Sequence, residues 1–479
     1  MEAGGYKGQG VPSGPSRPLR TLLGVAALAA AAGGTALLIR SNYQVGLGIV
    51  GVAGAAVLCA RYPAASVTAV VFVTGAYGSL TAFWNFPAGP AADVLLGGLW
   101  AATLWHLTRH RRPRWWVPPA IVAVVAYLSL TAVQIAFAAS VSIGLQSFRA
   151  SAWYLAAGVL VAYAPWSQAT RRRIVNGVLL VCLGVGAYAV YRWLFGAAPQ
   201  EADLAKQVSY TNTLDGELGL VGSLTSRHEL GGWTALAVPF CLTMTLTLRD
   251  RWRFVAGAAA TACMFALLAS ETRAALVAVI PALVLVLVLY QFSRGFPGLH
   301  LGATAVAAIA IVAVGVFQFS GATGDSTRAK THFQLILTPS QDPAYKRRIY
   351  KWDTALADIA RHPMGQGLGT AGRVQQEHGR FANVASIDVD SSYLKIAYEQ
   401  GTWLMIFVIA TLLALLASLG RKACLTPDRE RAGIAIAGAA ALLCMGLLMV
   451  FGTYVEGLPA LLAWLLVGLG IGAVAQRAG

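Results

Sequence analysis

Hydrophobic residues occur along the chain in long blocks, which short polar segments separate. Most blocks are about 18–22 residues long, the length that a helix needs to cross roughly 30 Å of hydrocarbon. Because they show no period-two alternation, helices are expected rather than a transmembrane barrel. The pattern predicts an all-α, polytopic helical bundle of about 14 membrane spans. The expected spans lie near residues 21–39, 44–60, 64–83, 92–107, 117–138, 151–165, 174–194, 230–248, 254–270, 274–292, 299–318, 400–419, 433–452 and 458–476.

The same pattern divides the chain into four parts. Residues 1–19 read as a flexible cytoplasmic tail rich in Gly, Pro and Ser, and the block that follows is too long to be a removable signal peptide. Residues 20–318 form spans one to eleven, with a minor exterior loop at 195–229, and residues 391–479 form the last three spans. Between them, residues 319–390 form a large extracytoplasmic loop.

The large loop carries a helical pattern of its own. Ile349, Trp352, Leu356 and Ile359 recur at offsets 0, 3, 7 and 10, and Lys346, Arg347, Arg348 and Lys351 crowd the first turns. The helix should end at His362-Pro363, where Gly365, Gly367 and Gly369 follow at alternate positions. A basic amphipathic helix beside a membrane normally lies on its interface. The alternative is a helix that packs over the bundle.

Composition excludes an ordinary soluble enzyme, because 57% of the residues are hydrophobic and 12% charged, against roughly 25% charged in soluble domains. The net charge of +16 does not indicate nucleic-acid binding, because its basic clusters adjoin apolar blocks at alternate gaps. That alternation follows the positive-inside rule, which predicts a multi-pass protein of the plasma (inner) membrane with both termini in the cytoplasm. The clusters are Arg109 to Arg114, Arg171 to Arg173, Arg249 to Arg253, and Arg421 to Arg431.

The six cysteines lie in apolar blocks or, for Cys424, in a predicted cytoplasmic loop. No disulfide framework is therefore implied. Their spacing does not suggest a metal site either, and no cofactor is expected.

Ionisable residues gather at the predicted outer edge of the bundle, where they are functional candidates because charge in or beside a membrane span is costly. Four segments supply them: Arg149; Arg227, His228 and Glu229; Glu271 and Arg273; and Asp388, Asp390, Tyr393, Lys395 and Glu399. These groups could simply pair with one another at the loop ends. Alternatively, they bind a phosphorylated lipid headgroup, because guanidinium binds phosphate bidentately and keeps its charge when partly desolvated.

Such a site can also do chemistry. A pyrophosphate leaving group gains negative charge as its bond to a sugar breaks, so arginines beside it stabilise the transition state more than the ground state. A carboxylate across the site could take the proton of an attacking sugar hydroxyl. Because the arginines supply the positive charge, this hypothesis needs no metal.

Several segments resemble the O-antigen ligase / O-antigen polymerase superfamily of bacterial membrane glycosyltransferases. They are Gly222 to Gly232, Ala269 to Leu276 with its Ser-Glu-Thr-Arg-Ala turn, Trp352 to Gly369 with its His-Pro-x-Gly-x-Gly core, and Asp390-Ser391-Ser392-Tyr393-Leu394 followed by Glu399-Gln400-Gly401. The resemblance covers about residues 140–420, and it lies in the order and spacing of these motifs.

The resemblance implies transfer of glycan from undecaprenyl pyrophosphate at the outer face of the membrane. Arg273 would contact the pyrophosphate, with Arg227 and Arg149 as further phosphate or sugar contacts. Asp390 stands where the family has its histidine base, and aspartate is the weaker base unless burial raises its pKa. This departure favours a polymerase over a ligase. His378 and His362 are the alternative bases.

We therefore expect a metal-independent, inverting polymerase of lipid-linked glycan repeat units. Asp390 would activate or orient the acceptor hydroxyl, supported by Glu399 and Tyr393. The remaining substrate-binding candidates are His228, Glu229, Arg347 and Arg348. The expected partners are an undecaprenyl-pyrophosphate-linked oligosaccharide, an acceptor glycan, the lipid bilayer and a chain-length regulator, with no nucleic acid.

Three alternatives remain open. The first is a ligase that moves finished glycan to a lipid or protein. The second is a transporter or flippase for a lipid-linked sugar, which predicts midplane charges and two similar halves of the bundle. The third is a glycosyltransferase that uses a polyprenyl monophosphate sugar, which a multi-carboxylate motif in the first exterior loop would favour; residues 40–43 are Arg-Ser-Asn-Tyr.

Overall fold

The computed structural model describes residues 43–109, 119–208, 212–214, 217–293, 339–341, 343–372 and 389–475. The expected tail at 1–19, the spans at 21–39 and 299–318, most of the large loop, His378 and Asp388 lie outside these described residues.

The described chain is helical apart from its connections and one pair of two-residue strands, so the all-α prediction is confirmed. The helices before the large loop are α2 (Tyr43–Arg61), α3 (Pro63–Trp84), α4 (Ala88–Arg109), α5 (Pro119–Gln134), α6 (Val141–Phe148), α7 (Tyr154–Tyr163), α8 (Gln168–Phe195), α9 (Pro199–Val208), α10 (Arg227–Thr247), α11 (Trp252–Ala269) and α12 (Arg273–Ser293). After it come α15 (Pro343–Arg361), α17 (Ser392–Gln400), α18 (Thr402–Leu425), α19 (Arg429–Phe451) and α20 (Leu458–Ala475). Short elements are the 3-10 turns Ile135–Phe137 and Pro339–Gln341, a π-helical segment Arg149–Trp153, and the antiparallel strands β1 (Thr213–Leu214) and β2 (Glu217–Leu218).

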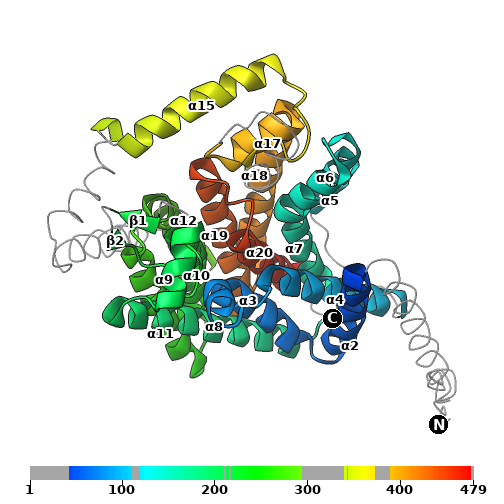
Figure 1. Cartoon of the computed structure of the whole chain (residues 1–479). Coiled ribbons are helices and arrows are strands. Elements are labelled where there is room, and N and C mark those ends of the chain that lie inside the picture. The colour runs from blue at the N-terminus through cyan, green and yellow to red at the C-terminus, as the bar shows by residue number, and fades with distance from the viewer. Residues whose placement is uncertain are drawn as a thin grey trace, which may run out of the picture.

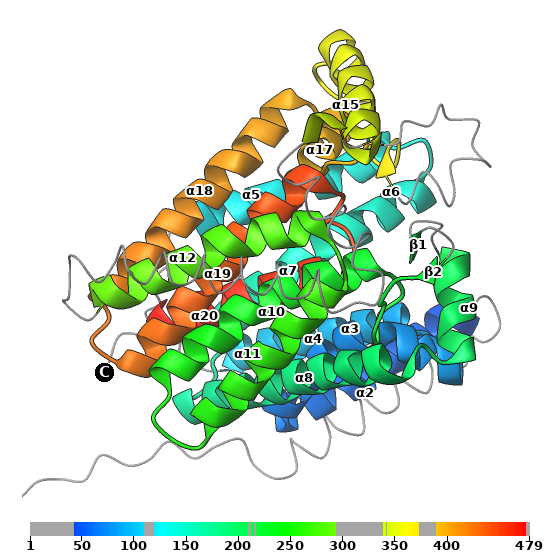
Figure 2. The ribbon, with the colours of Figure 1, turned by 90° about the vertical axis from the view of Figure 1, so that its left-hand side faces the viewer.

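Eight of the described helices are long and apolar enough to cross a membrane. Figure 2 shows the main helices running side by side, with α6, α9, α15 and α17 at one end of the bundle and the C-terminus at the other. We call these the α15 end and the opposite end. At the opposite end Arg172 pairs with Asp250 at 2.8 Å and with Glu430 at 2.6 Å, so basic clusters far apart in the sequence meet there.

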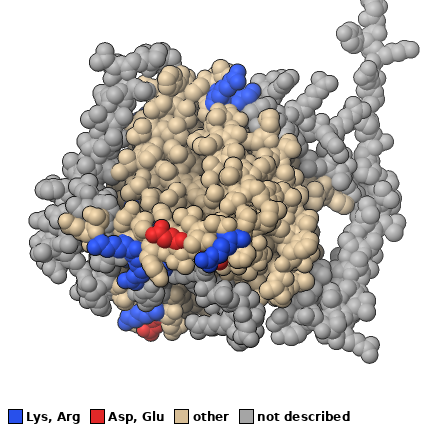
Figure 3. Space-filling view, turned by 90° about the horizontal axis from the view of Figure 1, so that it is seen from above, with Lys and Arg blue, Asp and Glu red and all other residues tan. Residues whose placement is uncertain are grey.

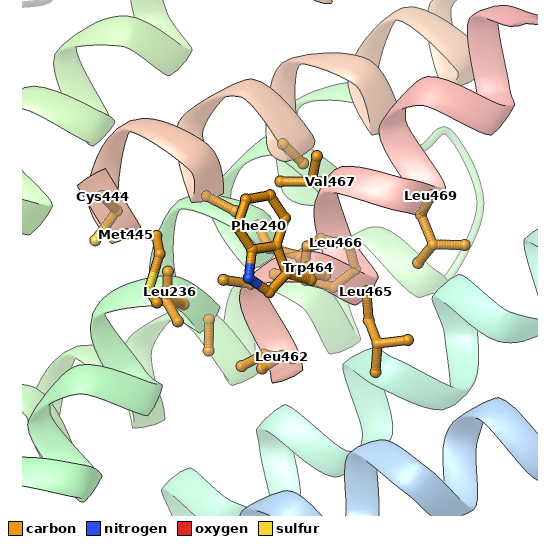
Figure 4. Close-up of a cluster of buried hydrophobic side chains, with 14 of the residues drawn as sticks. Leu236, Phe240, Cys444, Met445, Leu462, Trp464, Leu465, Leu466, Val467 and Leu469 are labelled. Atoms are coloured by element: carbon orange, nitrogen blue, oxygen red, sulfur yellow. The ribbon is translucent and has the colours of Figure 1, made fainter. Parts of the chain in front are cut away.

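Helices α10, α19 and α20 form the centre of the bundle, and most of their side chains are buried. Figure 4 shows Leu236 and Phe240 of α10 beside Met445 of α19 and the Leu462–Leu469 stretch of α20. Small residues let helices approach closely: a Cβ on Gly468 would lie 2.3 Å from the carbonyl oxygen of Gly158 on α7. Close packing of this kind holds membrane helices together, because apolar lipid leaves no hydrophobic driving force between them.

Polar side chains begin several helices by accepting N–H groups that have no partner within the helix. Ser167 accepts the N–H of Thr170 at α8, and Asp428 accepts those of Glu430 and Arg431 at α19. Both caps lie at the opposite end, where they fix the ends of two long helices.

Three local features differ from the sequence prediction. The span expected at 400–419 is preceded by a separate short helix, α17, because Gly401 takes a φ of +100° and breaks the helix before α18. The minor loop at 195–229 contains α9 and the two strands. The span expected at 151–165 begins with a π-helical segment, Arg149–Trp153, before α7 continues it.

Helix α15 lies across the top of the bundle above α17 (Figure 1). Its predicted end is confirmed, because it stops at Arg361, just before His362-Pro363. Ala355 and Ile359 are buried against Ala397 and Tyr398 of α17. The helix therefore packs over the bundle, as the second of the two alternatives describes.

Candidate active site

The two segments that carry Arg227 and Arg273 lie side by side. Each arginine is the first residue of its helix, α10 and α12 respectively. The Thr272 hydroxyl donates a 3.0 Å hydrogen bond to the carbonyl oxygen of Arg227, and a Cβ on Gly231 would lie 2.5 Å from the Cβ of Thr272. The starts of two helices thus meet at one point, and each helix dipole adds positive potential there.

Side-chain hydrogen bonds hold the first turn of α10 in place. Ser226 caps the helix by accepting the N–H of Glu229, whose carboxylate accepts a hydrogen bond from the Thr225 hydroxyl. The backbone N–H of Arg227 donates to the buried Asn212 side chain at 3.2 Å. Arg227 itself is buried, with 7% of its surface exposed. Its guanidinium is therefore held in a partly desolvated position, which strengthens attraction to an anion.

The turn before Arg273 has a special backbone conformation. Glu271 takes a φ of +51°, which is uncommon for a residue with a side chain and often marks a functional turn. The Ser270 hydroxyl accepts the N–H of Thr272 at 3.3 Å and donates to the carbonyl of Leu267 at 2.7 Å. These bonds fix the direction in which α12 starts, and with it the half-buried Arg273.

The loop at residues 452–457, between α19 and α20, connects the start of α10 to the segment of Asp390. The Tyr454 hydroxyl donates to the carbonyl oxygen of His228 at 3.5 Å. On its other side, the Ser392 hydroxyl donates to the carbonyl of Gly452 at 2.8 Å and accepts the N–H of Val455 at 3.0 Å. The loop is the structural bridge between the arginines and Asp390.

Asp390 precedes α17 and is fixed to α15. Lys351 Nζ lies 3.2 Å from Asp390 Oδ2, and Trp352 Nε1 donates to the backbone carbonyl of Asp390 at 3.4 Å. The Asp390 side chain is 36% exposed, so it is not deeply buried. It is instead an accessible carboxylate beside an ammonium group.

Helix α15 also brings Arg348 toward the arginine pair. Burial raises the pKa of Tyr454, while the positive charges of Arg348 and Arg227 lower it and the carboxylate of Glu229 raises it. These three charges therefore act on one phenol of the bridging loop. Arg348 is half-buried and Arg347 is exposed. In Figure 3, the charged side chains visible on the face seen from above gather mainly toward one side of it.

Arg149 is held separately from the other two arginines. Its Nε lies 2.5 Å from Asp93 Oδ2 on α4, and the side chain is 46% exposed. Two residues earlier, the Ser147 hydroxyl donates to Glu399 at 3.4 Å. The Arg149 segment thus touches the Asp390 side of the site, but the carboxylate of Asp93 offsets its charge.

Glu399 belongs to a buried ion cluster. Its Oε2 lies 2.5 Å from Lys395 Nζ, which also lies 3.1 Å from Glu456 Oε1. Its Oε1 accepts the N–H groups of Gly369 and Ala371 at 3.0 and 3.1 Å. Tyr393 likewise acts as an anchor, because its hydroxyl donates to the carbonyl of Gly446 on α19 at 2.9 Å.

Lys395 is among the ionisable candidates of the sequence but has no role there, and Glu456 is not among those candidates. Two signals could have found them. Lys395 stands four residues before Glu399 in a largely apolar segment, and Glu456 is an acid between two apolar blocks. His362 is 54% exposed and lies 3.5 Å from Asp358 at the end of α15. Within the described ranges, no group of three His, Cys, Asp or Glu side chains could hold a metal ion.

Residues 258–409 match the family model described as O-antigen ligase. The matched part contains Arg273, α15, Asp390, Tyr393 and Glu399, whereas Arg149 and Arg227 precede it. The similarity to the O-antigen ligase / O-antigen polymerase superfamily is thereby confirmed for this part of the chain. No curated protein matches the chain.

Proposed function

We propose that this membrane protein polymerises undecaprenyl-pyrophosphate-linked glycan repeat units at the outer face of the plasma membrane. The observation that carries the proposal is the contact between the starts of α10 and α12, which sets Arg227 beside Arg273 and, through loop 452–457, joins both to the segment of Asp390. The O-antigen ligase match supports glycan processing of this type. In this proposal the α15 end faces outward and the basic opposite end faces the cytoplasm.

The donor's pyrophosphate binds between Arg273 and Arg227. Both guanidinium groups stand at helix starts, so the helix dipoles and the side chains favour the same anion. Arg348 approaches from α15 and completes the positive side of the site, with Arg347 exposed near it. His228 and Glu229 lie in the first turn of α10 as sugar-binding candidates. Arg149 is the weakest phosphate contact, because Asp93 already pairs with it.

The transfer step is an in-line displacement. The acceptor hydroxyl oxygen attacks the anomeric carbon, the bond from that carbon to the pyrophosphate oxygen breaks, and the hydroxyl proton passes to the Asp390 carboxylate. The lipid pyrophosphate leaves as an anion, which the arginines stabilise as its charge grows. The anomeric centre is inverted. Asp390 must exchange Lys351 for the acceptor hydroxyl, so the acceptor binds where α15 now contacts Asp390.

Glu399 and Tyr393 support the site without touching the sugar in this proposal. Glu399 is 2% exposed and its carboxylate is occupied by an ammonium group and two backbone N–H groups. The wet, accessible carboxylate of the site is Asp390. A chain-length regulator and the acceptor glycan are the partners that a polymerase would need at the α15 end.

Two substitutions test the proposal. In cells whose chromosomal gene carries Arg273→Lys or Asp390→Asn, surface polymer is separated on a gel. We expect R273K to shorten or abolish the polymer, because an ammonium group cannot bind phosphate bidentately, and D390N to do so by removing the proton acceptor. Arg253→Lys, at the exposed opposite end, is the matched control and should leave the ladder unchanged.

The form of the defect identifies the reaction. A single capped repeat unit in the variants supports a polymerase, whereas full-length chains that remain unattached would move the proposal to a ligase. Ladders of normal length from both R273K and D390N would overturn the assignment of these residues to catalysis.

A further inference from the structure

A lysine is fully buried between two carboxylates at the α15 end. Lys395 is 1% exposed, and its ammonium group contacts Glu399 at 2.5 Å and Glu456 at 3.1 Å. Taking three charges out of water is expensive, and apolar side chains in such places are often as stable or more so. Stability alone therefore does not explain why these three charges are buried together.

The cluster joins segments that are distant in sequence. Glu399 accepts the N–H groups of Gly369 and Ala371 and thereby holds the segment that follows α15. A Cβ on Gly372 would lie 2.6 Å from Lys395 Cε and 3.2 Å from a Glu456 oxygen, so this segment covers the cluster at close range. Glu456 belongs to loop 452–457. The ammonium group is thus the point where three parts of the chain meet: α17, the bridging loop, and the segment of residues 365–372 after α15, which we call the glycine segment.

The bridging loop makes an ion pair at Glu456 and neutral hydrogen bonds at Gly452, Tyr454 and Val455. Ser392 binds Gly452 and Val455, and Tyr454 binds the carbonyl of His228. The Lys395–Glu456 ion pair ties this loop electrostatically to α17. If it were lost, the start of α10 could shift against the segment of Asp390.

We propose that Lys395 and Glu456 are positioning residues, whose buried ion pair, completed by Glu399, sets the placement of Asp390 relative to the arginines of α10 and α12. This inference rests on the proposed function, because it concerns the two sides of that same site. Neither residue touches substrate: both act through the bridging loop and α17. Transfer depends on such placement, since a displacement of about 1 Å can cost on the order of a hundredfold in rate.

The test separates donor binding from transfer. The double variant K395M/E456Q removes one charge of each sign and leaves Glu399 its two backbone N–H partners. Purified protein in nanodiscs is measured for binding of undecaprenyl pyrophosphate, and for chain extension with lipid-linked oligosaccharide extracted from cells that lack the gene. We expect binding within about twofold of wild type, because Arg227 and Arg273 remain, and extension lower by roughly tenfold to a hundredfold.

A second buried ion pair provides the matched control. Arg192 and Glu201 join α8 to α9 at the α15 end, 2.8 Å apart and with side chains 13% and 3% exposed. R192M/E201Q makes the same chemical change away from the bridging loop and should extend glycan at the wild-type rate. If K395M/E456Q does not fold, E456Q alone keeps the Lys395–Glu399 pair and should show a smaller loss of extension with unchanged binding.

The outcomes distinguish this inference from the function on which it rests. Wild-type extension by K395M/E456Q, or loss of donor binding in step with extension, overturns the positioning role while the R273K and D390N results stand. Failure of the wild-type protein to extend the extracted oligosaccharide overturns the proposed function, and the positioning role with it.

Discussion

The buried cluster shows how single residues balance burial against charge. Burial raises the pKa of Glu399 above its ordinary value, while the ammonium group of Lys395 opposes that rise. For Lys395, burial lowers the pKa, but Glu399 and Glu456 together raise it above its ordinary value. The two carboxylates therefore hold the Lys395 ammonium group in its charged form.

Lys395→Met should make the protein sensitive to pH. Without the ammonium group two buried carboxylates repel each other, and the change should cost about 3–5 kcal/mol at neutral pH. An acid whose pKa is raised by folding lowers stability as pH rises through that raised pKa, so the variant should gain stability when the pH is lowered from about 8 to about 5. Thermal unfolding at several pH values measures this. If the melting temperatures of K395M and wild type were equally independent of pH, the proposed repulsion between the two carboxylates would be contradicted.

Among the arginines, local partners set the expected role. Arg227 is buried at a helix start, whereas Arg149 is nearly half exposed and pairs with Asp93. The sequence places both beside apolar blocks at the same depth and cannot separate them, because Asp93 lies 56 residues away on another helix. Pairing across the bundle, rather than residue type, makes Arg149 the weaker candidate to bind an anion.

At the scale of elements, the glycine segment follows α15 and covers the buried Lys395 cluster. Gly365, Gly367, Gly369 and Gly372 all have a positive φ, between +76° and +101°. A Cβ on Gly369 would lie 2.2 Å from Ile143 Cγ2 of α6, so the segment also lies directly against α6. Glycine is thus required there for both conformation and space.

Gly369→Ala should therefore damage the site beyond its conformational cost. The positive φ costs about 1 kcal/mol for a residue with a side chain, and the clash with Ile143 adds about 1–3 kcal/mol. Gly196→Ala is the control, because Gly196 has a φ of +78° and nothing within 4 Å of the added carbon. We expect G369A to lower both melting temperature and glycan extension, and G196A to lower only the former slightly. If G369A and G196A lowered the melting temperature and glycan extension equally, the contact with α6 would not be what holds the glycine segment.

The elements that the sequence predicted well are those with one clear periodicity. The helix at Pro343–Arg361 has an apolar stripe, a basic start and a His-Pro stop, and all three signals agree. The break at Gly401 was missed, because a glycine inside an apolar run is compatible with a continuous span until its φ is known. α9 was missed because it is short and polar, so its ten residues resembled a loop.

At the scale of the whole molecule, the polar segments of the α15 end are joined by short contacts across the bundle. Asp390 touches α15, Ser392 touches loop 452–457, that loop touches α10, and α10 touches the turn before α12. The sequence predicted the depth of these segments, because apolar block ends fix it. It places a loop between the last two spans, but it could not predict that this loop connects α10 to α17, since those contacts depend on residues far away in the sequence.

The proposed orientation can be tested directly with single cysteines. Tyr350 on α15 is 73% exposed, and Arg251 is exposed at the opposite end. Five of the native cysteines are buried, so only half-buried Cys424 needs replacement by serine. In intact spheroplasts, a membrane-impermeant maleimide should label Y350C and leave R251C unlabelled until the membrane is opened, because the basic end faces the cytoplasm. Labelling of R251C alone would put the arginine site on the cytoplasmic side, where finished lipid-linked units could not be joined outside the cell.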